Sequence, residues 1–469
     1  MPNPRVAIIG GGISGLATAY FLARQGIGST LIEKTNRLGG LIRTDHIDGC
    51  YLEAGPDSFL SSKPAVIELA DELGDLRAQL IPSNDGARRI FIARDGKLVP
   101  MPSGMAMMVP GQWSPALRSP LFSLETKLRF VRETFYRPRT RTADISVGEF
   151  VADHFGRAVL ETAAEPLLTG VYGGDVANLS ARSVLPRFLE YEAEYGSLIR
   201  GVKAARKHAG PGLGFFQSFR GGMQMLTDSL AQASSGAVQV VHGEATRIER
   251  SNDHWRVRVH ESLEVDEVVL SCPAYVSAAL LENLQPALAT ELAAIPYTSA
   301  VLVTLLYDRA ALPASGQSFG FLVPRAERRS VAAVTWTHGK FPEKMSPGVA
   351  GARAFLVGAD AVEASRVPEA DLVRTVESEL DRLAGIRAKP ARWLVHSWPN
   401  SMPQYVLGHG DRRERIRELL SHAPGLHVIG NAYEGVGVPD CVRLAKETAN
   451  KIAERRSPDP RLVGVMKSN

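Results

Sequence analysis

The sequence has 469 residues, of which 45% are hydrophobic and 22% charged, and its formal net charge is only +4. These values are typical of a folded protein with two or three domains and exclude a mainly disordered chain. The small, dispersed charge argues against a nucleic-acid partner. The three cysteines form no C-x-x-C pair, and no disulfide framework, zinc site or other metal site is predicted.

The N-terminus leads at once into an apolar strand pattern, without the basic, apolar and small-residue regions of a signal peptide. We therefore expect a cytoplasmic protein. The longest strongly apolar stretch, 297–307, is shorter than the roughly 20 apolar residues that cross a bilayer. No transmembrane span is predicted.

A strand, a glycine turn and a helix follow one another near the N-terminus. Residues 5–9 predict a buried parallel strand, and an apolar-periodic helix runs to about Gly26. In the G-x-G-x-x-G turn between them, Gly10 permits a tight turn and Gly12 lets a pyrophosphate approach the backbone. Gly15 allows close packing of helix on strand, with the helix N-terminus facing the phosphates.

The next strand, 29–32, ends in Glu33, where a carboxylate can accept hydrogen bonds from both ribose hydroxyls. A glycine motif alone is often only a turn, but the strand, helix and acidic residue together predict dinucleotide binding. Arg37, Gly39 and Gly40 then favour FAD over NAD, because this stretch resembles flavoproteins of the amine-oxidase class. The alternative for Arg37 is an exposed side chain before a turn.

The middle of the chain predicts helices and then a second sheet. Residues 114–208 have mainly helical patterns, including a helix opened by a Ser146 cap. The pattern at 265–270 predicts a core strand that leads out of the nucleotide domain. The β-rich segments 300–306 and 331–335 indicate a second domain.

Near the C-terminus, 426–431 predicts another buried strand, and 435–439 leads into a helix from about Asp440 to Arg455. Pro439 suits the first turn of that helix. A helix N-terminus beside the N1–C2=O edge of a flavin would stabilise the charge of the reduced ring by about 0.5–2 kcal/mol. Both ends of the chain are thus expected to meet around one cofactor.

Three further segments form a family pattern together with the C-terminal glycines: Gly55-Pro56-Asp57-Ser58-Phe59, Gly170-Val171-Tyr172-Gly173-Gly174-Asp175 and Trp398-Pro399-x-x-Met402-Pro403-Gln404-Tyr405. With these segments, the chain resembles the oxygen-dependent porphyrinogen oxidase family, within the FAD-dependent amine-oxidase-like flavoproteins. The resemblance covers nearly the whole chain and implies an α/β fold with a Rossmann-like FAD-binding domain, a discontinuous α+β substrate domain and a helical insert.

Because the flavin motifs come from distant parts of the chain, the FAD-binding domain is expected to be discontinuous. It would comprise 1–85, 215–275 and 395–469, with 276–394 as substrate domain and 86–214 as a mainly helical insert lining the active-site mouth. By similarity, FAD contacts Gly10, Gly11, Gly12, Ile13, Ser14, Gly15, Glu33, Lys34, Arg37, Gly39, Gly40, Gly55, Pro56, Asp57, Ser58, Thr246, Trp398, Gly437, Val438 and Pro439.

Two residues of the expected flavin site have simpler alternatives. Thr246 is equally well explained as a β-forming residue in an ordinary strand. Cys441 falls within the C-terminal helix, so we expect it to pack as a small hydrophobe and FAD to be bound non-covalently. Tyr405 and Asn431 are expected to serve the flavin edge or the packing beneath it.

The family's activity implies that FAD removes six electrons from a porphyrinogen, coproporphyrinogen III or protoporphyrinogen IX, with oxygen as acceptor, in haem biosynthesis. Because the flavin carries the chemistry, no protein residue is assigned as catalytic. Arg89 is either a clamp for a propionate or a solvated arginine on an edge strand. Tyr172, Gly173 and Gly174 are expected to shape the pocket wall.

Coproporphyrinogen III is favoured as the substrate, because basic side chains suit its four carboxylates. These are Arg88, Arg94, Lys97, Lys203, Arg206 and Lys207. The alternative functions are another amine-oxidase-like flavoenzyme, such as an amine oxidase or carotenoid-type desaturase, and a non-enzymatic carrier of FAD or porphyrin.

The resemblance also implies partners. A downstream haem-pathway chelatase is expected, and the helical insert would allow peripheral contact with the inner face of a membrane. The Met-rich segment 105–110 is either an apolar loop for that contact or a buried gap filler.

Overall fold

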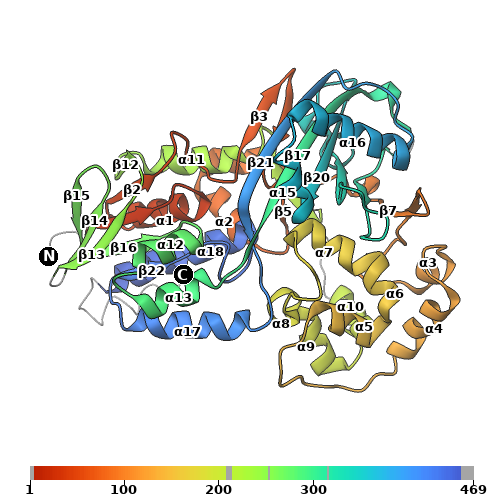
Figure 1. Cartoon of the computed structure of the whole chain (residues 1–469), viewed down its shortest axis with the longest axis horizontal. Coiled ribbons are helices and arrows are strands. Elements are labelled where there is room, and N and C mark those ends of the chain that lie inside the picture. The colour runs from red at the N-terminus through yellow and green to blue at the C-terminus, as the bar shows by residue number, and fades with distance from the viewer. Residues whose placement is uncertain (1–4, 208–213, 252–253, 314–315, 456–469) are drawn as a thin grey trace.

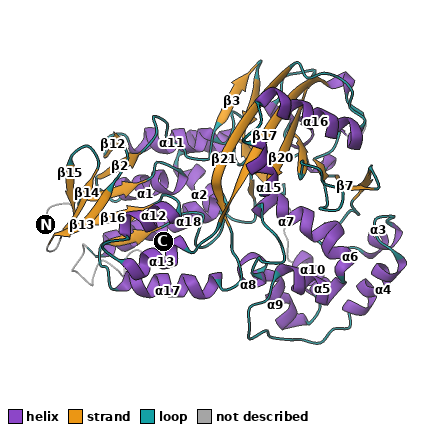
Figure 2. Ribbon diagram, viewed as in Figure 1, coloured by secondary structure: helices purple, strands orange, loops and turns teal. Residues whose placement is uncertain are grey.

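A computed structural model describes residues 5–207, 214–251, 254–313 and 316–455. The chain forms three parts, and the described residues begin and end in the first of them (Figure 1). Two parts contain sheets with helices, and the third is built almost entirely of helices (Figure 2).

The first part is built on a parallel sheet. Within the described ranges, its strand order is β12-β2-β1-β16-β22. The central strand β1 is buried along its whole length, as the apolar run predicts. This arrangement confirms the predicted Rossmann-like fold. The strands are β1 (Val6–Ile9), β2 (Ser29–Glu33), β12 (Val238–His242), β16 (Glu267–Leu270) and β22 (Leu426–Val428).

Side chains of β1 alternate between two cores. Val6 and Ile8 face one core, and Ala7 and Ile9 face the other. Helices α1 (Ile13–Arg24), α2 (Ala65–Glu72), α11 (Gln224–Ser234) and α18 (Val438–Glu454) contribute to the first core. The second core is covered by α12 (Ala274–Leu281), α13 (Pro286–Ala293), α17 (His409–Ser421) and the sheet of β13 (Arg247–Ser251), β14 (His254–Arg258) and β15 (Ser262–Val265).

The second part is a sheet whose order, in the described part of the chain, is β21-β17-β20-β19-β18-β7-β8. Helix α16 (Glu369–Ala384) packs on it through a shared apolar core. The segments 300–306 and 331–335 fall largely in β17 and β19, as predicted. The strands are β7 (Ile90–Arg94), β8 (Lys97–Pro100), β17 (Tyr297–Asp308), β18 (Gly320–Leu322), β19 (Ala333–Trp336), β20 (Val349–Val357) and β21 (Arg392–Pro403).

The third part contains the helices expected between 114 and 208. Ser146 caps α5 as predicted, because its hydroxyl accepts the N–H of Glu149 at 3.0 Å. Fully buried Phe130, Phe150 and Phe155 fill the core of this part. Its helices are α3 (Trp113–Arg118), α4 (Leu124–Glu133), α5 (Val147–Phe155), α6 (Arg157–Val159), α7 (Glu165–Tyr172), α8 (Ala181–Val184), α9 (Pro186–Tyr195) and α10 (Leu198–Lys207).

The remaining elements are short. No helix among the described residues is long and apolar enough to span a membrane. The short elements are β3 (Thr44–Ile47), β4 (Cys50–Glu53), β5 (Phe59–Leu60), β6 (Leu80–Pro82), β9 (Met105–Ala106), β10 (Val109–Pro110), β11 (Phe216–Phe219), α14 (Thr337–Lys340) and α15 (Ala359–Ala364).

The sheets also show how the proposed domain boundaries relate to the strands. Strands β7 and β8 lie within 86–214 but extend the second sheet, where β7 pairs in parallel with β18. Strand β21 crosses the proposed boundary at 395 and pairs with β17. We therefore propose that the helical insert begins after β8 and that the last segment of the FAD-binding domain begins after β21, with Trp398 reaching the flavin from the second part.

Candidate active site

The turn between β1 and α1 requires glycine. A Cβ on Gly10 would lie 3.0 Å from Ser271, and one on Gly15 would lie 2.0 Å from the carbonyl oxygen of Gly10. The space beside Gly12 is open, since an added Cβ would meet only Gly40, at 3.9 Å. No side chain caps α1, which leaves its first N–H groups available to an anionic group. These features fit the pyrophosphate of a dinucleotide.

Glu33 lies at the end of β2, beside this turn. Its carboxylate accepts the N–H of Gly11 at 2.7 Å and the N–H of Thr35 at 2.9 Å. The carboxylate is therefore held in one orientation next to the open space beside the glycines. Its contact with a ribose stays a prediction.

Arg37 organises the loop that follows β2. Its guanidinium donates to the carbonyl oxygens of Leu38 at 3.0 Å and Ile42 at 2.9 Å. Gly39, with φ of 108°, donates its N–H to the carbonyl of Gly11 at 2.7 Å. Burial and then neighbouring Arg43 lower the pKa of Arg37. The loop is thus closed onto the glycine turn, and the predicted phosphate contact of Arg37 remains untested.

Segment 55–58 is packed between the first two parts. A Cβ on Gly55 would lie 1.8 Å from the carbonyl oxygen of Leu41, so only glycine fits there. Trp398, on β21, donates its indole N–H to the carbonyl of Ala54 at 2.7 Å. The structure therefore brings Trp398 to this segment, although more than 300 residues separate them along the chain.

Buried charges surround the same segment, and sequence analysis did not identify them. Lys340 donates to both oxygens of Asp57 at 3.0 Å, and a guanidinium nitrogen of Arg353 lies 3.6 Å from Asp57. Lys344 donates to Glu53 at 2.6 Å. Burial alone would raise the pKa of Asp57, but Lys340 and Arg353 hold it well below its usual range. This carboxylate is ionised at neutral pH.

One signal in the sequence could have indicated this network. Arg353 is a lone charged residue in the otherwise apolar strand β20, and its side chain is 3% exposed. A charge in such a strand requires a partner. Lys340 and Lys344 carry no comparable signal, because nothing in their local sequence reveals their burial.

Helix α18 begins directly after the C-terminal glycines. Val438 and Pro439 form its first turn, and Gly437 precedes it as predicted. The carboxylate of Asp440 accepts the N–H of Gly437 at 3.3 Å and the ammonium of Lys63 at 2.6 and 2.8 Å. Lys63, which sequence analysis did not single out, thereby ties the N-terminal segment to this helix.

The end of α7 meets the end of β21. Gly173 takes a left-handed conformation, with φ of 65°, and ends the helix. A Cβ on Gly174 would lie 1.8 Å from the side-chain oxygen of Gln404. Gln404 also donates its amide to the carbonyl of Tyr172 at 2.6 Å. Both glycines therefore permit the close approach of helix and strand, and their place in the wall of a substrate pocket stays a prediction.

Tyr172 and Tyr405 lie beside the start of α18, with ring centroids 6.3 Å apart. Burial and then Asp440 raise the pKa of Tyr172 to about 12, so its hydroxyl is neutral. The hydroxyl of Tyr405 donates to the carbonyl of Asn431 at 2.7 Å and accepts the N–H of Gly435 at 2.8 Å. Tyr405 therefore anchors the glycine loop that precedes α18.

Other candidate residues lie at the surface. Arg89 is exposed directly before β7. Lys34 forms an exposed ion pair with Glu244 at 2.7 Å. Thr246 is exposed, and its N–H donates to the carbonyl of Arg258 at 2.9 Å, so that N–H is not free for an adenine. The predicted ligand contacts of these residues remain untested.

The basic residues that favoured a four-carboxylate substrate have varied surroundings. The guanidinium of Arg88 lies 3.8 Å above the ring centre of Phe215. Arg94 donates to the carbonyl of Leu121 at 2.8 Å, which gives it a structural role. The side chain of Lys207 lies outside the described residues.

Comparison with known proteins identifies the family. Residues 13–453 match the flavin-containing amine oxidoreductase family. The chain is 32% identical to coproporphyrinogen III oxidase of Bacillus subtilis over 457 residues, which cover 94% of this chain and 96% of that relative. It is 31% identical to human protoporphyrinogen oxidase over 478 residues, which cover 95% of this chain and 97% of that relative.

Solved structures agree with this assignment. A protein from Exiguobacterium sp. 255-15, named as a candidate protoporphyrinogen oxidase, superposes with a TM-score of 0.86 at 29% identity, covering 97% of this chain and all of that one. Cyclohexylamine oxidase of Brevibacterium oxydans shares the fold at 17% identity, with a TM-score of 0.68 and coverage of 97% and 99%. The chain therefore belongs to the flavin-containing amine oxidoreductases and uses FAD, in the group that contains the coproporphyrinogen III and protoporphyrinogen oxidases.

Proposed function

We propose that this chain oxidises a porphyrinogen to a porphyrin in haem biosynthesis, with bound FAD and with oxygen as acceptor. The observation that carries the proposal is similarity over nearly the whole length to coproporphyrinogen III and protoporphyrinogen oxidases. The convergence of Trp398, Tyr172 and the start of α18 on the predicted flavin segments supports it.

When bound, FAD supplies the oxidising group that accepts electrons from the saturated bridges of the porphyrinogen. The protein's residues hold and shape the site. The glycine turn and the N-terminus of α1 would hold the pyrophosphate, and Glu33 would hold the ribose. Asp57 would lie at the flavin with its charge balanced by Lys340 and Arg353. The neutral hydroxyl of Tyr172 adds no charge to the substrate wall.

We favour coproporphyrinogen III over protoporphyrinogen IX. The exposed guanidinium of Arg89 is suited to a propionate, and a substrate with four propionates offers more such contacts. Purified protein should convert coproporphyrinogen III to a fluorescent porphyrin in air, with release of hydrogen peroxide. A clear preference for protoporphyrinogen IX in the same assay would reverse the substrate assignment, and no turnover of either would refute the function.

We also propose that FAD is held without a covalent bond. Cys441 is buried within α18, and burial raises the pKa of its thiol to about 11, so little reactive thiolate exists near neutral pH. Acid precipitation should leave colourless protein and release all the flavin into solution. Flavin that stays with the precipitated protein would contradict this proposal.

The helical part is the proposed site of peripheral contact with a membrane. The Met-rich segment offers little apolar surface for it, because Met108 and Val109 are fully buried and only Met107, at 37%, is exposed. Instead, apolar side chains of α4 and the turn after it are exposed. We call this set the α4 stripe: Leu124, Leu128, Val131 and Phe135.

A haem-pathway chelatase is the proposed downstream partner, since a porphyrin product is the substrate for metal insertion. If the two proteins bind each other, mixing them should slow the diffusion of each. Unchanged diffusion at micromolar concentrations of both would count against a stable complex.

A further inference from the structure

A cavity of about 570 Å³ opens on the helical part between the end of α4, α5 and α9. Arginines dominate its wall: Arg132, Arg137, Arg139 and Arg141, with Phe135 beside them. None of the residues predicted to contact FAD or porphyrinogen lines it. The cavity is therefore separate from the candidate active site.

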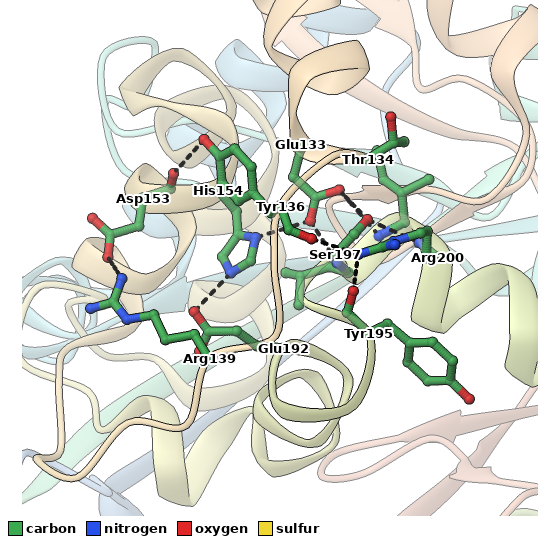
Figure 3. A network of polar contacts seen from close by, with 12 residues as sticks. Glu133, Thr134, Tyr136, Arg139, Asp153, His154, Glu192, Tyr195, Ser197 and Arg200 are labelled. Carbon is green, nitrogen blue, oxygen red and sulfur yellow. Dashed lines mark hydrogen bonds and ion pairs between the residues drawn. The ribbon is translucent and has the colours of Figure 1, made fainter.

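Paired charges hold the floor of the cavity in place, and Figure 3 shows those of His154 with Glu133 and Glu192. Arg141, with its side chain 5% exposed, donates to both oxygens of Glu192 at 2.8 Å. His154 lies between Glu133 at 2.9 Å and Glu192 at 3.3 Å. Burial alone would lower the pKa of His154, but hydrogen bonds to Glu133 and Glu192 raise it. The floor is thus ordered before any ligand arrives.

The outer arginines are not neutralised in this way. Arg132 and Arg137 form no ion pair with any residue that the structure describes. Among the described residues, Arg139 forms an ion pair with Asp153 alone, at 3.9 Å, and Asp153 also accepts from Arg141 at 3.0 Å. Positive charge therefore exceeds negative charge at the mouth of the cavity. Guanidinium groups that converge on one space are suited to a phosphate, which they bind in a bidentate manner.

The cavity adjoins the α4 stripe, because Phe135 belongs to both. Along α4, the stripe lies opposite the buried face that contains Phe130. Leu124 and Phe135 are 74% and 78% exposed, which is unusual for side chains of this size. A ligand that fits both features has an anionic head and an apolar chain.

We propose that the arginine cavity binds the phosphate group of an anionic lipid, with the acyl chain against the α4 stripe. This inference rests on the membrane contact proposed above and is independent of the oxidation reaction. A phosphomonoester headgroup, as in phosphatidic acid, presents the oxygens that several arginines can share. A basic patch beside exposed apolar residues is also typical of proteins that bind anionic membranes.

Dihexanoyl phosphatidic acid, used below its micelle concentration, tests the cavity without a membrane. By calorimetric titration of the FAD-loaded protein, it should bind more tightly than either dihexanoyl phosphatidylcholine or inorganic phosphate. The double variant Arg132→Gln/Arg137→Gln should weaken this binding roughly 30-fold, at about fivefold for each charge. The control Arg374→Gln/Arg387→Gln, on exposed arginines of the second part, should change it little.

A second variant separates the contribution of the acyl chain to the affinity from that of the headgroup. Leu128→Gln/Phe135→Ser should reduce the affinity for dihexanoyl phosphatidic acid to that for inorganic phosphate. Equal binding of phosphatidic acid and inorganic phosphate to the unmodified protein would overturn the lipid assignment. If the arginine variant bound dihexanoyl phosphatidic acid as tightly as the unmodified protein does, the assignment of the site to the arginine cavity would be overturned. Both double variants should keep porphyrinogen turnover, which distinguishes failure of this proposal from failure of the oxidase function.

Discussion

Two groups of buried charges connect different pieces of the molecule. One surrounds Glu53 and Asp57, and the other surrounds Glu133 and Glu192. The first group joins the N-terminal segment to Lys340, Lys344 and Arg353, which belong to the second part of the fold. The second group joins helices of the helical part to one another, as Figure 3 shows.

The two groups also differ in charge balance. In the first, cations outnumber carboxylates among the described residues, and the excess lies beside the segment predicted to contact FAD. In the second, Glu192 pairs with Arg141 and the imidazole of His154 lies between Glu192 and Glu133, so there is no such excess of cations. Because breaking a buried pair leaves an uncompensated charge, both groups should matter for stability, but only the first should matter for FAD.

Lys344→Met should have the largest effect. It removes the cation from Glu53, whose side chain is 2% exposed, and should lower the free energy of unfolding by about 3–5 kcal/mol. Because Glu53 lies next to segment 55–58, FAD should also be lost at lower urea concentration. Urea unfolding followed by flavin fluorescence measures both effects. Lys446→Met, which breaks an exposed pair with Glu72, should cost less than about 1 kcal/mol; equal losses in the two variants would refute the distinction.

Glu133→Gln should destabilise the helical part while FAD stays bound. The carboxylate of Glu133 is fully buried and accepts hydrogen bonds from His154, Ser197 and the N–H of Leu198. Loss of its charge should lower the free energy of unfolding by about 2–3 kcal/mol. Glu125→Gln on the exposed side of α4 serves as the control. Release of FAD by Glu133→Gln would show that the two groups do not act separately.

Glu192 should make the helical part sensitive to acid. Burial alone would raise its pKa, but hydrogen bonds from His154 and Arg141 lower it to about 2, from an ordinary value of 4.5. The stabilisation is therefore present above pH 4.5 and is lost as the pH falls towards about 2. Urea midpoints measured across this range should fall more steeply for the unmodified protein than for Glu192→Gln. Parallel curves would contradict the assignment.

Ser146→Ala should have the smallest effect. It removes the hydroxyl that caps α5 and should lower the free energy of unfolding by about 1 kcal/mol without loss of FAD. Ser146→Thr keeps a hydroxyl at the same position and should recover most of the stability. Thermal unfolding of the three proteins measures the difference, and a Thr variant as unstable as the Ala variant would rule out the cap as the cause.

Sequence analysis predicted the features that depend on neighbouring residues. The glycine turn at Gly10 to Gly15, Glu33 at the end of β2 and the cap at Ser146 are each determined within a few positions. The start of α18 was predicted for the same reason, from its glycines and Pro439.

Individual side-chain contacts between distant parts of the chain were not predicted. The pairing of Lys340 with Asp57 joins residues 283 positions apart, and neither local sequence specifies a partner. Strand β7 has a clear strand pattern, but its parallel pairing with β18 is decided by tertiary packing. The family resemblance predicted that Trp398 contacts FAD, which stays a prediction, and its hydrogen bond to Ala54 could be found only in three dimensions.

The central claim is that distant ends of the chain enclose an FAD that oxidises a porphyrinogen. Its most direct test is to mix the purified yellow protein with coproporphyrinogen III in the absence of oxygen and to follow the visible absorption of the flavin. We expect that absorption to disappear and to return when air is admitted, while porphyrin fluorescence appears. A protein that retains FAD but whose absorption is unchanged by coproporphyrinogen III and by protoporphyrinogen IX would contradict the claim.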